Sequence, residues 1–367
     1  MNNTKSIDIL GSRGIPANHG GFETFAERLA IYLTKKSWKV TVYCQDEGKG
    51  LSETEWNGIR LIRIGAGTNS PFATIKFDFL STLHSCKENS LKLILGYNTA
   101  IFGIIHKIRG RIQIINMDGI EYLRPKWPWY AKIWFFINEK IACLIADHLI
   151  ADHPEIKKHH QKFAPWKKIS MIAYGGENVE QADEALLSKY DLEPQKYFLM
   201  IARSEPENLV LEIVRTFSKK KRGCKLIIVG PHDPERQKYH RRLKENASSE
   251  VIFLGSIYHK QTLAALRFFC LAYIHGYTVG GTNPSLVEAM GAGAMIIARE
   301  NWFNVWVVGS AGLYFQSEEE LEKHIEEIIL KHADENGRSI IKKRFHEKFK
   351  WQQILEEYRQ ILYQHAV

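Results

Sequence analysis

The sequence predicts an α/β protein built from two doubly wound domains, each with a parallel sheet. Short apolar runs, typical of buried strands, alternate with segments of helical periodicity through the first half of the chain. The same alternation starts again at Tyr197, after a stretch rich in Gly, Glu, Asp and Gln. Because 367 residues are too many for one ordinary core, this restart indicates a second domain of similar build.

The first domain is expected to span residues 1–176 and the second residues 195–345. Residues 346–367 are expected to form a C-terminal helix, whose apolar stripe can pack back on the first domain. The strands expected in the first domain are 7–10, 39–43, 59–64, 91–95, 112–116 and 148–151, with helices over 22–35 and 75–89. Those expected in the second domain are 197–202, 225–229, 251–254, 271–274 and 295–298, with helices near 209–219 and from residue 284 onward.

A glycine-rich turn, residues 11–21, joins the first strand to the first helix. Glycine adopts positive φ readily and lets the backbone come close to a ligand. The amides of Gly20 and Gly21 are expected at the start of a helix, where the dipole favours an anion. The turn therefore fits a phosphate cradle, although these residues alone fit an ordinary glycine-rich turn equally well.

A second glycine-rich turn, residues 275–283, follows the strand that ends at Ile274. Pro284 suits the first turn of a helix, so the preceding residues are expected to offer amides at a helix N-terminus. Glu288 lies about one turn further on, where its carboxylate can accept two hydrogen bonds from ribose hydroxyls. The alternative is a surface glutamate that the helix dipole favours.

The two turns together resemble those of the retaining glycosyltransferases of family 4, which have the GT-B fold of two Rossmann-like domains facing a central cleft. The resemblance covers essentially the whole chain. The segments 11–16 and 116–121 are further similar to a bacterial rhamnosyltransferase subgroup that acts on polysaccharide precursors. The other matching segments are Gly-Gly-x-Glu at 20–23, 146–153, Tyr-Gly-Gly at 174–176, 201–208 and 282–290.

The resemblance implies transfer of a sugar with retention, with L-rhamnose from dTDP-L-rhamnose as the expected donor. The expected acceptor is a lipid-linked oligosaccharide precursor of a surface polysaccharide such as lipopolysaccharide O-antigen. Two positions depart from the family pattern. Gly280 stands where the first of two glutamates usually lies, which suits a 6-deoxy sugar, and Asn208 replaces a lysine. Arg203 is then expected to supply most of the side-chain charge at the diphosphate.

Two side chains are expected to carry the chemistry. Arg203 follows a strand end and can fork onto a phosphate, or else pair with Glu205 or Glu207 at the surface. Asp118 is expected to be the acceptor-side base or orienter, unless it is simply the aspartate of an Asp-Gly turn. The expected donor-binding residues are Gly20, Gly21, Arg203, Asn208, Gly281, Thr282, Asn283 and Glu288, and the expected acceptor-binding residues are Arg13, His19, Glu121 and Arg124.

Transfer is expected to need no metal and no other cofactor. No carboxylate pair of the DxD type follows a strand in the sequence. His148, His153, His159 and His160 have no carboxylate partners at the spacing of a metal site, so they are expected at strand ends and on the surface. Arg203 and helix dipoles would then neutralise the diphosphate.

The formal net charge of +9 suits anionic lipid, phosphorylated substrates or nucleic acid. No nucleic-acid-binding motif is present, so nucleotide sugar and lipid are the expected partners. Residues 127–150 are apolar but carry four charged side chains, which makes a transmembrane span unfavourable. The start of this segment, with Trp127, Trp129 and Phe135, can lie in a membrane interface or in the core.

Five scattered cysteines fit reduced thiols in a cytosol. The expected location is therefore cytoplasmic and peripheral at the inner face of the plasma membrane. Two other functions fit the same turns. One is a nucleotide-sugar 2-epimerase of the same fold, which would need a carboxylate and histidine set around the sugar. The other is a non-catalytic nucleotide-sugar-binding protein, which the missing first glutamate allows.

Overall fold

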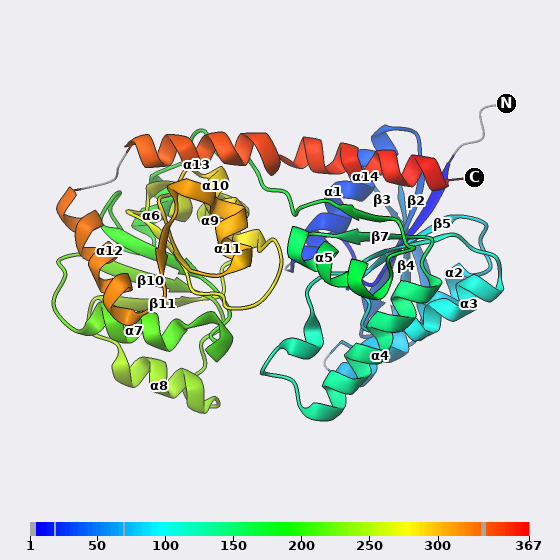
Figure 1. The fold of residues 1–367 in the computed structure, drawn as a ribbon, viewed down its shortest axis with the longest axis horizontal. Helices are drawn as coiled ribbons and strands as arrows, with labels where there is room; N and C mark the ends of the chain where they lie inside the picture. The colour runs from blue at the N-terminus through cyan, green and yellow to red at the C-terminus, as the bar shows by residue number, and fades with distance from the viewer. Residues whose placement is uncertain (1–4, 18–19, 69, 332–334, 367) are drawn as a thin grey trace. The chain divides into compact units, whose positions relative to one another are not determined.

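The computed structural model describes residues 5–17, 20–68, 70–331 and 335–366, and it divides into two compact units (Figure 1). Unit 1 comprises Met1–Ala173 together with Trp351–Val367, and unit 2 comprises Tyr174–Lys350. Each unit holds one largely parallel sheet covered by helices, as the sequence predicts.

The sheet of unit 1 has the order β3-β4-β2-β1-β5-β6-β7-β8. Its inner strands are short apolar runs, because helices cover both faces of a parallel sheet and leave no solvent-facing side. Leu10, Tyr43, Ile62, Ile64 and Phe77 form one of its buried clusters. The strands are β1 (Ser6–Leu10), β2 (Lys39–Asp46), β3 (Gly50–Trp56), β4 (Ile59–Gly65), β5 (Leu91–Leu95), β6 (Gln113–Asn116), β7 (His148–Ala151) and β8 (Ile169–Met171).

The edge strand β3, which the sequence analysis does not predict, pairs with β4 in the antiparallel direction. β3 is exposed along nearly its whole length and consists mainly of polar residues, so its sequence has no apolar run typical of a buried strand. The turn between β3 and β4 holds Asn57 and Gly58, both with positive φ (51° and 74°). An Asn-Gly pair of this kind is the strongest short signal for a β-hairpin, and it would have revealed the strand.

The C-terminal helix α14 (Trp351–His365) belongs to unit 1 and packs on α1 (Gly21–Lys35). The ring centroids of Phe25 and Tyr358 lie 4.5 Å apart, and the Tyr32 hydroxyl donates to Glu356 at 2.6 Å. The apolar stripe read from the sequence is the buried face of α14. The remaining helices are α2 (Pro71–Ser85), α3 (Gly103–Ile108), α4 (Trp129–Ile145) and α5 (Pro154–Phe163), with 3-10 turns η1 (Ala100–Phe102) and η2 (Glu121–Leu123).

Unit 2 has a parallel sheet in the order β11-β10-β9-β12-β13-β14. Its core joins the strands to α7 and α12 through buried residues such as Phe198, Phe217 and Ile325. The strands are β9 (Tyr197–Ile201), β10 (Lys225–Val229), β11 (Val251–Gly255), β12 (Tyr273–His275), β13 (Ile296–Arg299) and β14 (Leu313–Phe315). The helices are α6 (Ala185–Ser188), α7 (Val210–Ser218), α8 (Lys238–Asn246), α9 (Lys260–Phe269), α10 (Pro284–Gly291), α11 (Trp302–Val308), α12 (Glu318–Lys331) and α13 (Glu335–Lys348), with η3 (Pro206–Asn208) and η4 (Gly309–Ala311).

Candidate functional site

The strand order locates the place in each sheet where ligands are expected to bind. In unit 2 the chain runs from β9 outward through β10 and β11, then returns to the other side of β9 to form β12. In unit 1 it runs outward from β1 through β2 and returns to the other side of β1 at β5. Such reversals leave a crevice at the carboxyl ends of the two strands. Both glycine-rich turns and the Arg203 turn follow strands at these reversals.

The turn after β9 presents Arg203 to solvent. Its side chain is about half exposed, and its Nη1 lies 3.4 Å from Oε1 of Glu205. This pair is weak because solvent screens it, so a phosphate could displace the carboxylate. Asn208 is buried and donates its side-chain nitrogen to the Arg203 carbonyl at 2.8 Å. In this structure Asn208 therefore stabilises the backbone of the turn that carries Arg203.

The loop after β12 packs against this turn. Thr278 donates both its backbone N–H and its hydroxyl to the carbonyl of Glu207, at 3.0 and 2.9 Å. A Cβ added at Gly276 would lie 2.3 Å from the Asn208 carbonyl oxygen, so only glycine allows this approach. The turn after β9 and the loop after β12 are thus held together at one edge of the sheet.

The start of α10 lies at the same edge. The helix begins at Pro284, as the sequence predicts, and Asn283 caps it by accepting from the Ser285 N–H at 3.0 Å. The Ser285 hydroxyl donates to the Ile201 carbonyl at the end of β9, at 3.3 Å. This bond ties the helix start to the strand that precedes Arg203. Gly280 has φ 127°, and a Cβ added there would meet open space, whereas Thr282 is buried.

Glu288 projects from α10 toward α9. Its Oε2 accepts a hydrogen bond from Nη2 of Arg267 at 2.5 Å, and the carboxylate remains one-third exposed. Arg267 is nearly buried and fixes the orientation of this carboxylate, while Oε1 remains for another donor. No sequence pattern pointed to Arg267, because it lies on a different helix from Glu288.

Several buried polar atoms beside these turns form no hydrogen bond within the described ranges. They are Ser204 Oγ, Asn208 Oδ1 and both ring nitrogens of His275. Burial lowers the pKa of His275 to about 3, so its ring is neutral at physiological pH. Unsatisfied polar atoms are uncommon in native proteins and often mark a place that a ligand or water completes.

The glycine-rich turn of unit 1 has the positive φ angles that the sequence predicts for its glycines. Gly11, Gly14 and Gly20 have φ of 83°, 111° and 95°. Gly20 is the N-cap of α1 and has no side chain with which to cap it, so the first-turn amides of the helix are not satisfied by that residue. Glu23 in the first turn accepts from the Arg13 N–H at 2.8 Å, and the Arg13 side chain is exposed. The expected acceptor ligand His19 lies outside the described residues.

Asp118 follows β6 on a turn with φ 49°, in the left-handed region. Its N–H donates to Oδ1 of Asn116 at 2.9 Å. Burial, helped by the nearby charge of Glu121, raises the pKa of Asp118 from 3.8 to about 6. A carboxylate with such a pKa is a suitable base near neutral pH, because it is ionised yet still basic enough to take a proton.

Glu121 and Arg124, both expected to bind the acceptor, bind one another. Their Oε1 and Nη1 atoms lie 2.8 Å apart, and the second oxygen of Glu121 accepts from the indole N–H of Trp127 at 2.8 Å. The Tyr97 hydroxyl completes the loop by donating to the Gly119 carbonyl and accepting from the Glu121 N–H. The buried Glu121 therefore holds the Asp118 loop in shape.

The C-terminal helix reaches the same loop, which the sequence did not reveal. The Tyr358 hydroxyl of α14 accepts from Nδ2 of Asn116 at 2.7 Å, and Oδ1 of the same amide accepts from the Asp118 N–H. Tyr358 and Asn116 are both buried. Tyr358 thus orients the amide that fixes the Asp118 turn.

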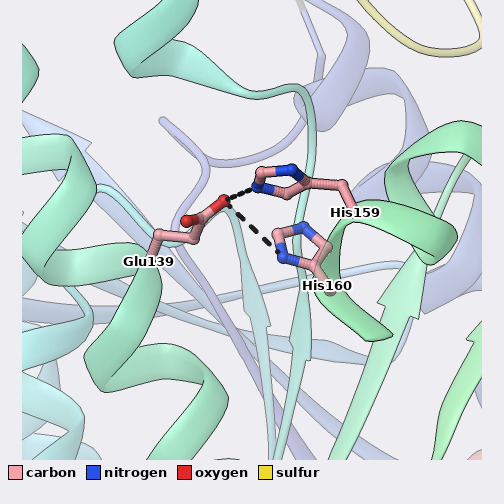
Figure 2. A group of neighbouring side chains, drawn as sticks. All are labelled: Glu139, His159 and His160. Carbon is pink, nitrogen blue, oxygen red and sulfur yellow. Dashed lines mark hydrogen bonds and ion pairs between the residues drawn. The ribbon is translucent and has the colours of Figure 1, made fainter. Parts of the chain in front are cut away.

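One prediction about the histidines is wrong. His159 and His160 do have a carboxylate partner, Glu139 of α4, as Figure 2 shows. Nε2 of His159 lies 2.8 Å from Oε1 of Glu139, and His160 is fully buried rather than at the surface. The sequence concealed the partner because it lies on the preceding helix, twenty residues away.

The apolar segment that forms α4 is buried in its second half, as expected, and partly exposed in its first half. Its second half is largely buried, with Ala142 and Cys143 in the core. Phe135 is also buried, which agrees with the core alternative at this position, whereas Trp129 is 73% exposed. Within the described residues, no helix is both long enough and apolar enough to cross a bilayer.

Comparison with known proteins bears on both units. Residues 4–177 match a domain of unknown function, DUF1972, and residues 195–331 match the family described as glycosyl transferases group 1. The chain is also similar to an uncharacterized glycosyltransferase of Methanocaldococcus jannaschii, at 26% identity over 289 residues. That match covers 72% of this chain and 71% of the relative.

Two solved structures have the same fold over nearly their whole length. Sucrose-phosphate synthase from Thermosynechococcus elongatus gives a TM-score of 0.81 at 18% identity, covering 98% of each chain. HepE of Anabaena, in complex with UDP and glucose, gives a TM-score of 0.75 at 16% identity, covering 98% of this chain and 99% of that one. These similarities confirm the expected GT-B fold of two α/β domains with parallel sheets.

Proposed function

We propose that this chain, a glycosyltransferase of the group 1 type, holds a nucleotide sugar at the strand reversal of unit 2 and transfers its sugar to a lipid-linked acceptor. The observation that carries the proposal is the packing of the Arg203 turn against the loop that leads into α10. An exposed guanidinium and the amides at a helix start converge at one sheet edge, which is the chemistry that a diphosphate requires.

Each donor group has a partner in this arrangement. Arg203 binds the diphosphate and exchanges its weak contact with Glu205 for a charge-assisted pair with phosphate. The amides of Gly281 and Thr282, just before α10, approach the same anion. A role of Gly20 and Gly21 at the start of α1 in binding the donor stays a prediction. Oε1 of Glu288 accepts from a ribose hydroxyl, while Arg267 keeps its other oxygen in place. HepE, whose structure was solved with UDP and glucose, supports a nucleotide-sugar donor.

The transfer step breaks the bond between the anomeric carbon and the diphosphate oxygen, and the electron pair leaves with the phosphate. The acceptor hydroxyl oxygen forms the new bond to the anomeric carbon, with retention of configuration. Its proton passes to Asp118, or to the departing phosphate with Asp118 orienting the hydroxyl. Arg203 and the helix start stabilise the charge that develops on the leaving group, so transfer needs no metal. Arg13 and Arg124 are the basic residues assigned to an acceptor phosphate.

The proposed donor is dTDP-L-rhamnose. Gly280 places no carboxylate beside the donor sugar and leaves open space there, which suits a 6-deoxy sugar with fewer hydroxyls to bind. A thermal-shift screen against nucleotide sugars should give the largest rise in Tm with dTDP-L-rhamnose. A larger rise with UDP-glucose would overturn the assignment of the donor.

Incubation with the nucleotide sugar that gives the largest Tm rise, followed by analysis of the products, separates the alternative functions. With donor and acceptor lipid present, a transferase releases nucleoside diphosphate and forms a glycosylated lipid. A 2-epimerase yields an isomer, or nucleotide and a sugar derivative, without acceptor, and a binding protein yields no product. Release of nucleotide that depends on the acceptor is the expected result, and it should persist in excess chelator.

The proposed acceptor requires contact with a membrane, and α4 offers a surface for it. Trp129, Tyr130 and Ile133 are 73%, 64% and 51% exposed, in a segment that also carries Lys126 and Lys132. Exposed aromatic residues beside lysines suit an anionic membrane surface. The indole N–H of Trp127 donates to Glu121, so Trp127 is kept unchanged in the variant tested below.

Flotation with liposomes tests the membrane proposal. Wild-type protein should float with anionic liposomes, less so at high salt, and little with neutral ones. Replacing Trp129, Tyr130 and Ile133 by serine should reduce flotation. Trp302→Ser is the matched control, because Trp302 is 79% exposed on unit 2. Equal flotation of the triple variant and the control would contradict this role for α4.

A further inference from the structure

A carboxylate and two imidazoles gather between α4 and α5 of unit 1, apart from the residues assigned above to donor or acceptor (Figure 2). Oε1 of Glu139 lies 2.8 Å from Nε2 of His159 and 3.6 Å from Nδ1 of His160. One ligand atom from each of the three residues lies within 4.8 Å of the other two. Glu139 and His160 are fully buried, and His159 is slightly exposed, which leaves a path to solvent.

The second imidazole is a buried polar group without a hydrogen bond. Neither ring nitrogen of His160 has a hydrogen-bond partner among the described residues, although its exposed fraction is zero. Burying such a group unsatisfied costs free energy, because it gives up its bonds to water. A cation seated between the three side chains would satisfy Nδ1 of His160 and also neutralise part of the charge of Glu139.

The surroundings prepare Glu139 to bind through one oxygen. Its Oε2 accepts a hydrogen bond from Nζ of Lys140 at 2.8 Å, which leaves Oε1 directed toward the two histidines. Metal-binding carboxylates are commonly held in this way by a second hydrogen bond that fixes their orientation. The Lys140 ammonium is placed in turn over the ring of Phe163.

The ligand set selects the kind of metal. Two imidazoles and one carboxylate suit zinc and similar divalent transition metals, whereas magnesium and calcium prefer oxygen ligands throughout. In a tetrahedral zinc site with bonds of about 2.0–2.1 Å, neighbouring ligand atoms lie roughly 3.3 Å apart. The distances of 2.8 and 3.6 Å from Oε1 to the two nitrogens lie on either side of this value.

We propose that Glu139, His159 and His160 bind one divalent transition-metal ion, with zinc as the expected metal, that joins α4 to α5. The ion would have a structural role. It would fix the position of α4, the helix that carries the exposed Trp129. Through α4 it would also fix Tyr122 of the Asp118 loop, because the ring centroids of Tyr122 and Phe136 on α4 lie 5.4 Å apart. Such a site is separate from the diphosphate chemistry, for which no metal is proposed.

Zinc titration of the full chain tests the proposal without any mutation. Protein stripped with chelator, then dialysed, should bind one equivalent of zinc. At a zinc concentration a hundredfold above Kd, its Tm should rise by roughly 3–7 °C. Cobalt(II) in place of zinc should give the visible absorption of a tetrahedral site. Failure of the stripped protein to bind zinc or cobalt would overturn the proposal.

His160→Gln is the decisive variant, because the His160 ring makes no hydrogen bond that the change would remove. It should keep the circular dichroism of the wild type but lose stoichiometric zinc binding and the cobalt spectrum. Glu139→Gln should lose them as well. His346→Gln on α13 of unit 2 is the matched control and should bind zinc like the wild type. Equal zinc binding by His160→Gln and the control would place the metal elsewhere and contradict the site.

Discussion

The two strand-end turns that carry the proposed chemistry are built in opposite ways. The Arg203 side chain of unit 2 is about half exposed and lies 3.4 Å from Glu205, whereas Asn208 fixes the turn that carries it. Asp118 of unit 1 lies on a left-handed turn that is braced by Asn116 and Tyr358, and its pKa is raised. An exposed cation suits binding of an anion, and a partly desolvated carboxylate suits transfer of a proton. The contrast supports the proposal that unit 2 holds the donor and unit 1 the acceptor hydroxyl.

The largest effect should come from Asp118→Asn, because asparagine tolerates the same left-handed backbone but cannot accept the proton. A general base contributes about 10²–10⁴-fold. We expect kcat to fall at least a hundredfold. In the wild type, kcat/KM should decline as the pH falls through about 6, where Asp118 becomes protonated. A pH profile that stays flat down to pH 5 would exclude Asp118 as the base.

The same carboxylate should oppose folding at high pH. Its pKa is higher in the folded protein than in the unfolded chain, so its stabilising contribution is complete below pH 4 and is lost as the pH rises through about 6. Asp118→Asn should therefore raise Tm at pH 8 and leave it nearly unchanged at pH 4. Thermal unfolding of the variant and the wild type at both pH values measures this difference. A lower Tm for Asp118→Asn than for the wild type at pH 8 would contradict the prediction.

Arg203→Ala should lower kcat/KM roughly tenfold to hundredfold, which corresponds to about 1.5–3 kcal/mol for one hydrogen bond to a charged group. Arg203→Lys should lose less, because it keeps the charge but not the fork geometry. Steady-state kinetics with saturating acceptor measure both variants. Unchanged kinetics in Arg203→Ala would remove this residue from the donor site.

Glu288→Gln should weaken nucleoside diphosphate binding about two- to tenfold, since a neutral amide is a poorer acceptor for a ribose hydroxyl. The loss should be similar for every nucleotide donor, because the contact is to ribose and not to the transferred sugar. Isothermal titration measures it, with Glu327→Gln on α12 as the control. Equal affinity in Glu288→Gln and the control would refute the ribose assignment.

The smallest effect should come from Tyr358→Phe, which removes the acceptor of the Asn116 amide. We expect a severalfold loss in kcat, an unchanged Kd for nucleotide, and a destabilisation of about 1–3 kcal/mol. Tyr363→Phe on the same helix is the control, because Tyr363 is 55% exposed. If kcat and nucleotide affinity fell together, Tyr358 would have only a general structural role.

The sequence predicted those parts of the molecule whose cause is local. Residues 91–95, 148–151 and 225–229 are strands with the predicted bounds, since they are short apolar runs buried on both faces. The start of α10 at Pro284 follows from the chemistry of a helix N-terminus. Strand β3 was missed because an exposed edge strand carries no apolar run.

The interactions that the sequence could not reveal join residues far apart in the chain. Arg267 meets Glu288 across two helices, Tyr358 reaches Asn116 from the C-terminus, and Glu139 meets the two histidines of α5. Arg267, Tyr358 and Glu139 each lie on a helix, and the sequence around them does not indicate which distant residue they contact. Only the packing of the elements brings the groups into contact.

The division of roles between the units can be tested by one measurement, the Kd for dTDP of the wild type, Asp118→Asn and Arg203→Ala, obtained side by side by isothermal titration. The account predicts that Asp118→Asn binds dTDP as the wild type does while its turnover collapses, and that Arg203→Ala binds at least tenfold more weakly. Equal weakening in both variants, or tight binding by Arg203→Ala, would contradict the assignment of the donor to unit 2 and of the acceptor hydroxyl to unit 1.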